Sequence, residues 1–166
     1  MERHHSYVNA DRLARVIKVH QSGRVRAFWS AIGTWLDKDR RLARLASLYD
    51  GPAVDVLSVG TDFQIDRRGV DPRFEETPLR VPAGILKTRR ADVLSAELLA
   101  SHHRGYRNRV LMGPSWRADV WTVLETSSDL SIAEVARRAY SSFSTAWEVT
   151  QDYKLLRRAD EGSTGV

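Results

Sequence analysis

Residues 131–154 constrain the fold of this chain most, because they hold two amphipathic helical patterns separated by a short break. Ser131 and Glu134 form an S-x-x-E capping box, in which each side chain satisfies a free amide at the start of a helix. The break follows at 140–142, where Ser141 or Ser142 can cap the second helix. Apolar positions recur at three- and four-residue spacing in both halves: Ile132, Val135, Ala136 and Ala139, then Ala146, Val149 and Tyr153. Two short helices joined by about 3–4 residues predict a helix-turn-helix.

A third helix is expected immediately before this pair, over 116–126, with Val120, Trp121 and Leu124 pointing inward and a polar break after it at 127–129. Taken together, residues 117–156 resemble the helix-turn-helix of the winged-helix family of bacterial transcriptional regulators. The resemblance covers about 40 of the 166 residues. It implies a DNA-binding protein in which the second paired helix, the recognition helix, docks in the major groove.

The sequence departs from that family's pattern at three places. The turn position usually held by glycine is Tyr140, and a bulky residue with a positive φ is uncommon, so a different or strained turn is expected. Only ten residues follow Leu156, which is too few for the strand pair of a wing and predicts a frayed tail. The exposed positions of the recognition helix contain no Lys or Arg: they are Phe143, Ser144, Trp147, Glu148 and Gln151.

Composition limits the remaining possibilities. A length of 166 residues indicates one domain or two small domains that share a core, and an apolar share of 42% is enough for a buried core. The chain has no cysteine, which excludes disulfides, cysteine metal sites and thiol nucleophiles. No apolar run approaches the roughly 18 residues of a membrane span, and the start lacks the apolar core of a signal peptide. We therefore expect a cytoplasmic protein with no membrane partner.

The rest of the chain predicts a mainly α fold. Helical spacing predicts helices over 10–21, 24–36, 38–49 and 89–102, and Gly33 in the second of them allows another backbone to come close. Residues 53–59 fit either a short strand or the start of a helix, and 63–65 with 79–81 fit a short β pair. Because 60–82 is rich in glycine and proline, the expected division is a helical region 1–59, a loop or linker 60–87, and a helical region 88–166.

Catalytic motifs are absent from the sequence. There is no phosphate-cradling glycine loop, no G-x-S-x-G elbow and no His-x-x-x-His zinc helix. His102 and His103 are adjacent, so on a helix they point about 100° apart and cannot hold one ion from one face. We expect a protein that is not an enzyme and has no cofactor and no metal.

The net charge of +5 and the pI of about 9.9 indicate an anionic partner. The charge is uneven, however: residues 113–166 carry six Lys/Arg against eight Asp/Glu. The densest basic stretch is 87–109, where three arginines surround Tyr106. Basic residues around an aromatic ring suit phosphate contact, although a solvated helix face with a core tyrosine is the simpler interpretation.

Two hypotheses about function remain open. In the first, the chain is a transcriptional regulator that binds double-stranded DNA. The residues assigned to that contact are Ser142, Ser144, Thr145, Trp147, Gln151, Arg137, Arg138, Arg104, Arg107 and Arg109. In the second, the helix-turn-helix is a scaffold that presents Phe143 and Trp147 to another protein or to a second copy in a homodimer.

Overall fold

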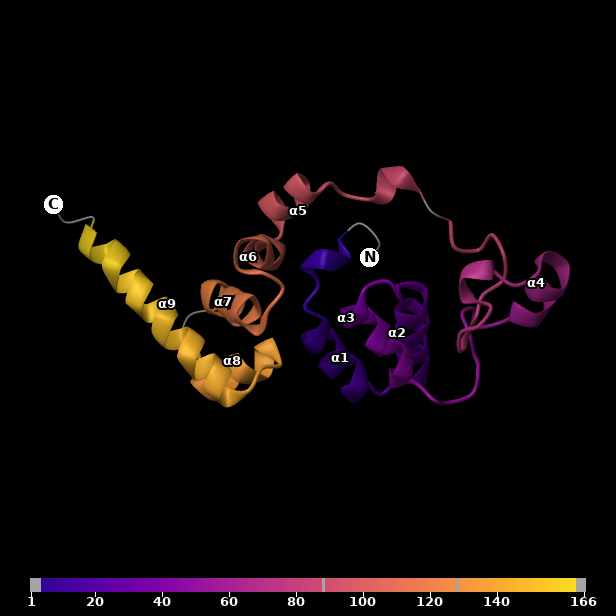
Figure 1. Cartoon of the computed structure of the whole chain (residues 1–166), viewed down its shortest axis with the longest axis horizontal. Coiled ribbons are helices and arrows are strands. Elements are labelled where there is room, and N and C mark those ends of the chain that lie inside the picture. The colour runs from indigo at the N-terminus through magenta and orange to yellow at the C-terminus, as the bar shows by residue number, and fades with distance from the viewer. Residues whose placement is uncertain (1–3, 88, 128, 164–166) are drawn as a thin grey trace. The chain divides into compact units, whose positions relative to one another are not determined.

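The computed structural model describes residues 4–87, 89–127 and 129–163 of the chain (Figure 1). The protein is mainly helical, as the sequence predicts, and the described residues contain one sheet, of two short strands. Two compact units make up the chain: unit 1 contains Met1–Arg12 and Leu94–Val166, and unit 2 contains Leu13–Val93. Within the described residues, no helix is both long and apolar enough to cross a bilayer.

Unit 2 is built around the helix α2. Its core contains Ala31 and Ile32 of α2 together with Phe74, Leu79 and Val81. The unit boundary falls inside α1, so most of that helix belongs here. The elements are α1 (Ala10–Val19), α2 (Gly23–Trp35), α3 (Arg40–Ala43), η2 (Arg44–Leu48), β1 (Val54–Asp55), α4 (Thr61–Arg68), η3 (Pro72–Phe74), β2 (Leu79–Arg80) and η4 (Arg90–Asp92).

Gly33 brings α2 against the backbone of η2. A Cβ atom on residue 33 would lie 2.5 Å from the amide nitrogen of Ala46, so only glycine fits without a shift. Beside it, the Ser30 hydroxyl donates a 2.6 Å hydrogen bond to the Ala46 carbonyl oxygen. The expected close backbone approach at Gly33 is confirmed, but the single helix predicted over 38–49 is divided into α3 and the 3₁₀ turn η2.

The β pair predicted from 63–65 and 79–81 is only half right, and the loop or linker predicted over 60–87 is wrong. Residues 63–65 lie in α4, so they cannot form a strand; β2 pairs instead with β1, in parallel and with Val54 opposite Leu79. Arg80 holds this arrangement by bonding both Asp55 and Asp62, a contact that is distant in sequence. The segment 60–87 is therefore a folded part of unit 2 rather than a loop or linker, because it supplies Phe74, Leu79 and Val81 to the core.

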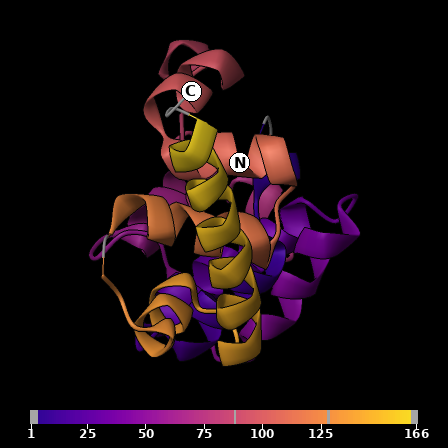
Figure 2. The ribbon, with the colours of Figure 1, turned by 90° about the vertical axis from the view of Figure 1, so that its left-hand side faces the viewer.

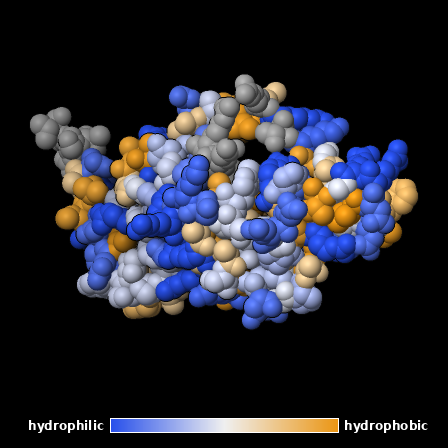
Figure 3. Space-filling view, turned by 45° about the vertical axis from the view of Figure 1, so that its right-hand side comes forward, coloured by the Kyte–Doolittle hydropathy of each residue, from blue (hydrophilic) through white to orange (hydrophobic). Residues whose placement is uncertain are grey.

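Unit 2 also leaves apolar side chains in solvent around α4. Figure 3 brings this side of the chain forward and shows apolar surface surrounded by hydrophilic surface. Two exposed hydrophobic side chains in and just before α4 are Val59 and Phe63, which are 86% and 63% exposed.

Unit 1 consists mainly of the helices that follow residue 94: α7 and α8 pack on the long α9, and α6 packs on α7 (Figure 1). The elements are η1 (His5–Tyr7), α5 (Ala96–His102), α6 (Arg104–Met112), α7 (Trp116–Thr126), α8 (Ile132–Ala139) and α9 (Phe143–Ser163). One core joins the last three helices and contains Val120, Val135, Ala136, Ala139, Ala146 and Val149. Figure 2 faces the outer side of α9, which runs through the foreground over its whole length.

Two predicted boundaries in unit 1 are also wrong. The helix expected over 89–102 begins only at Ala96, because the Ser95 hydroxyl accepts a hydrogen bond from Leu98 N and caps it there. The tail expected to fray after Leu156 continues α9 as far as Ser163. This extension leaves no strand pair after α9 within the described residues, and residues 164–166 lie outside them.

Candidate nucleic-acid interface on α8 and α9

The junction between α8 and α9 is a tight turn built on Tyr140. Tyr140 adopts the left-handed conformation with φ 59° and ψ 23°, which is the geometry that glycine usually supplies. Its amide donates to the Arg137 carbonyl at 3.3 Å, and the Ser141 amide donates to the Ala136 carbonyl at 3.0 Å. The last carbonyls of α8 are thus satisfied as they would be by a glycine turn, and the conformational strain falls on a tyrosine.

The capping predictions for the two helices are confirmed in part. The Ser131 hydroxyl accepts from Glu134 N at 3.2 Å and starts α8. The reciprocal bond of a capping box is not formed, since the Glu134 carboxylate accepts from Arg137 and Arg138. Ser142 caps α9, accepting from Thr145 N at 3.1 Å.

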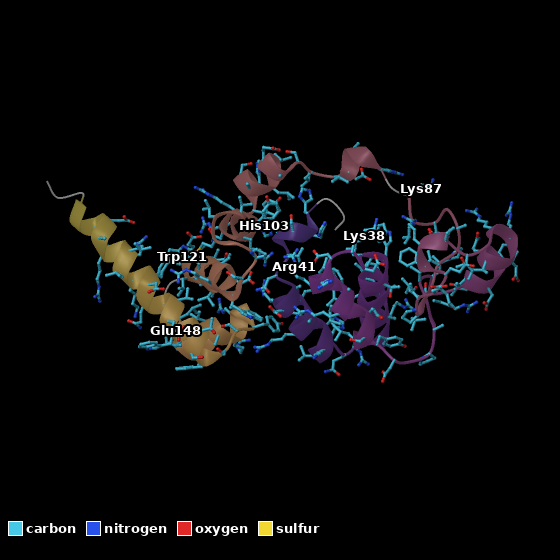
Figure 4. The ribbon with its side chains drawn as sticks, viewed as in Figure 1. Lys38, Arg41, Lys87, His103, Trp121 and Glu148 are labelled. Carbon is cyan, nitrogen blue, oxygen red and sulfur yellow. The ribbon has the colours of Figure 1, made fainter. Side chains whose placement is uncertain are left out.

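The outer face of the first turns of α9 is exposed, as expected. Phe143 and Trp147 are 59% and 51% exposed, while Ala146 and Val149 on the opposite face are buried in the core of unit 1. The exposed polar residues of this face are Ser144, Glu148, which points outward in Figure 4, and Gln151. Of the other predicted hydroxyl contacts, Ser142 is exposed and Thr145 is half-buried; their hydroxyl oxygens lie 2.8 Å apart.

Arg137 and Arg138 are exposed but share a carboxylate. The Arg137 guanidinium donates to Glu134 Oε1 at 2.6 Å, and Arg138 Nε donates to the same oxygen at 3.0 Å. Arg138 also donates to Ser127 Oγ at 3.1 Å. The hydrogen bonds from both arginines hold the pKa of the Glu134 carboxyl below its usual value, and the bond from Arg137 has the larger effect. The helix α8 therefore carries two cations in its last turn and, in its first turn, one anion that stays ionised at neutral pH.

Arg109 is half-buried in unit 1 and its side chain pairs with Asp119, which argues against its assignment to a phosphate-binding surface. Its guanidinium donates through Nε to Oδ1 of Asp119 at 3.0 Å, and Asp119 is only 3% exposed. The second carboxylate oxygen of Asp119 accepts from Asn9 Nδ2 at 2.7 Å, and Arg12 lies 3.5 Å from the first. A buried carboxylate needs such partners, so Arg109 stabilises the fold.

Arg104 and Arg107 of α6 are exposed, but they do not lie near the recognition face, which is the exposed face of α9 with Phe143, Ser144, Trp147, Glu148 and Gln151. Both line a groove together with Leu156 of α9. Leu156 lies nine residues after Trp147, which at about 100° per residue is half a turn around the helix. These two arginines therefore do not join the surface formed by Phe143, Ser144 and Gln151.

Lys154 and Arg158 are cations of α9 that the sequence interpretation did not assign to the interface. They lie seven and eleven residues after Trp147, which places both within about 20° of its direction around the helix. Both are exposed, and neither makes a side-chain ion pair with another described residue. The signal was present in the sequence, because strong helix formers continue without a break from Lys154 to Ala159.

Comparison with known proteins adds no family and no fold relative. No protein-family model matches the chain, no curated protein sequence matches it, and no solved structure matches it. Among the residues that the structure describes, no group of three or more His, Asp or Glu side chains is placed to hold a metal ion.

Proposed function

We propose that α7, α8 and α9 form a helix-turn-helix that binds double-stranded DNA, as a transcriptional regulator does, with α9 as the recognition helix. The observation that carries the proposal is the arrangement of α9: one face is buried against α7 and α8, and the opposite face of its first turns is exposed. The side chains of that face suit base edges, since glutamine pairs with adenine and serine bonds several bases.

The proposed interface has a polar centre and a cationic end. Ser144 and Gln151 contact base edges, and Trp147 offers the apolar contact that thymine methyl groups make. Lys154 and Arg158 continue the same line along α9, where they reach the phosphate backbone beyond the bases. Arg137 contributes a further phosphate contact from the end of α8, because its side chain is 72% exposed.

Selection from a pool of random duplex DNA tests this proposal. We expect the intact protein to enrich a motif and the Gln151→Ala variant to bind that motif at least about fivefold more weakly, the lower end of what one bidentate base contact contributes. Gln21→Ala is the matched control, since Gln21 is also exposed but lies in unit 2. Selection that enriches no sequence would rule out sequence-specific binding.

A protein-docking function is the second candidate, and the exposure of Phe143 and Trp147 is the observation that favours it. Aromatic side chains four residues apart on a helix form an apolar patch that a partner protein or a second copy can cover. Under this proposal, selection enriches no DNA motif and the protein sediments as a dimer. The Phe143→Ala/Trp147→Ala double variant then becomes a monomer, while Phe63→Ala, an exposed phenylalanine of unit 2, does not.

A further inference from the structure

A groove of about 760 Å³ lies between α6, α7 and α9 of unit 1. Sites for small molecules typically have volumes of about 300–1,000 Å³, so this groove has a suitable size. Its lining contains Arg107 and Leu111 of α6, Trp121 of α7, and Leu156 of α9. None of these residues belongs to the recognition face proposed above.

The apolar part of the groove contains two aromatic side chains, two leucines and Met112. Trp121 and Tyr153 pack edge to face, with ring centroids 5.0 Å apart and planes at 80°, and Figure 4 shows Trp121 between α7 and α9. Leu111 and Leu156 also line the groove and are 70% and 51% exposed. A ligand with an apolar body would remove this surface from water, which is favourable in proportion to the area buried.

The charge of the groove is positive. Four guanidinium groups line it (Arg104, Arg107, Arg117 and Arg157), against two carboxylates (Glu125 and Asp160). The Glu125 carboxylate is already bound on both oxygens: Trp121 Nε1 donates to Oε1 at 3.2 Å, and Asn108 Nδ2 donates to Oε2 at 2.8 Å. Glu125 therefore holds α6 and α7 together.

Arg107 is the cation best placed to meet a ligand. Arg117 pairs with Asp152 at 2.6 Å, Arg157 approaches Glu161 at 3.7 Å, and Arg104 donates to the Glu125 carbonyl oxygen at 2.9 Å. The Arg107 side chain, by contrast, makes no hydrogen bond or ion pair within the described part of the chain. An exposed guanidinium next to apolar surface suits a carboxylate or sulfonate, because its fork of N–H groups binds two anionic oxygens at once.

We propose that this groove binds a small organic anion that has a flat apolar body and one carboxylate or sulfonate group. The body packs on Trp121, Tyr153 and Leu156, and the anionic group bonds Arg107 with Arg104 beside it. The site is independent of DNA binding, since it uses the side of α9 opposite to Trp147.

The test compares two probes of the same shape, 1-naphthoate and the neutral 1-naphthalenemethanol, by isothermal titration calorimetry on the intact protein at about 150 mM salt, where exposed charges are screened. We expect saturable 1:1 binding of 1-naphthoate and at least about tenfold weaker binding of the alcohol, the effect of one charge-assisted contact. Equal affinity for the two probes, or no saturable binding of 1-naphthoate, would overturn the proposal.

Three variants locate the binding. Arg107→Gln is expected to weaken 1-naphthoate about tenfold and leave the alcohol unchanged, while Leu156→Ala weakens both probes. Arg24→Gln removes the same charge from an exposed position in unit 2 and is expected to change neither affinity. Arg107 is exposed, so its substitution should preserve the fold, which an unchanged melting temperature verifies. If Arg107→Gln has no effect, or Arg24→Gln has the same effect, the anion is not bound in this groove.

Discussion

At the scale of single residues, Gly33 gives the sharpest test of the packing of unit 2. Glycine inside a helix is normally about 0.5–1 kcal/mol less favourable than alanine, so Gly→Ala usually stabilises. At residue 33 we expect the opposite sign, because the added Cβ would lie 2.5 Å from Ala46 N and 2.9 Å from the Leu45 carbonyl carbon. Gly33→Ala should lower the free energy of unfolding by about 1–3 kcal/mol, measured by urea denaturation.

Gly23→Ala is the control for this substitution. Gly23 also lies in α2, but the nearest atom to an added Cβ is Tyr49 Cε2 at 3.7 Å, an ordinary contact. Its free energy of unfolding should stay within about 0.5 kcal/mol of that of the parent protein. A Gly33→Ala protein as stable as this control would mean that α2 and η2 do not lie in contact.

Residue-level predictions from the sequence succeeded where a local pattern decides exposure and failed where a distant partner does. Helical spacing was enough to place Phe143 and Trp147 outside and Val149 inside. Arg109 was assigned to a surface on charge density alone, and a dense basic stretch cannot reveal which of its cations has a buried partner. That partner is Asp119, which is held from the other side by Asn9, 110 residues earlier.

At the scale of elements, the turn between α8 and α9 carries a conformational cost that substitution can measure. An L-residue other than glycine in the left-handed region costs about 1–2 kcal/mol, and Tyr140 adopts that conformation. We expect Tyr140→Gly to be more stable than Tyr140→Ala by about 1 kcal/mol in thermal or urea unfolding. Both variants lose the tyrosine ring and its approach to Arg12, so their difference isolates the backbone effect. Equal stability of the two would show that the turn is not left-handed in solution.

The elements differ in how much the sequence reveals of them. The starts of α8 and α9 were predictable, since Ser131 and Ser142 cap them within one turn of the chain. The helix α4 was not, because a stretch of only eight residues between Gly60 and Gly69 contains too few apolar positions to separate a period of 3.6 from a period of 2. Its conformation is held in part by the bond between Asp62 and Arg80, which no local pattern contains.

At the scale of the whole molecule, the net charge is distributed unevenly between the two units. Unit 1 contains eleven Lys/Arg and eleven Asp/Glu, whereas unit 2 contains fifteen and ten, so the entire net charge of +5 belongs to unit 2. The sequence could not show this, because unit 1 is assembled from both ends of the chain through contacts such as that of Asn9 with Asp119. Charge counted over consecutive segments therefore does not give the charge of either folded unit.

Because unit 2 carries the net positive charge, we expect it to supply most of the non-specific affinity for DNA, while the recognition helix supplies the sequence preference. Non-specific affinity for duplex DNA depends on the number of phosphates neutralised and falls steeply with salt, so its larger part should come from unit 2. Replacing the exposed cations Lys18, Arg24 and Arg40 by glutamine should weaken binding to random duplex at about 50 mM salt by at least about tenfold. The remaining affinity should also decline less between about 50 and 200 mM salt, as measured by fluorescence anisotropy.

The two proposed contributions to DNA binding, from unit 2 and from the recognition helix, can be separated in this experiment. The triple variant keeps Gln151 and Ser144, so its preference for a selected motif over random duplex should persist while its affinity for both falls. Gln151→Ala should do the reverse, losing the preference and keeping the salt dependence, because it removes no charge. A triple variant with unchanged affinity and an unchanged salt dependence would mean that unit 2 makes no phosphate contact. In that case Lys154 and Arg158 of α9, with Arg137 of α8, would have to account for all of the salt dependence.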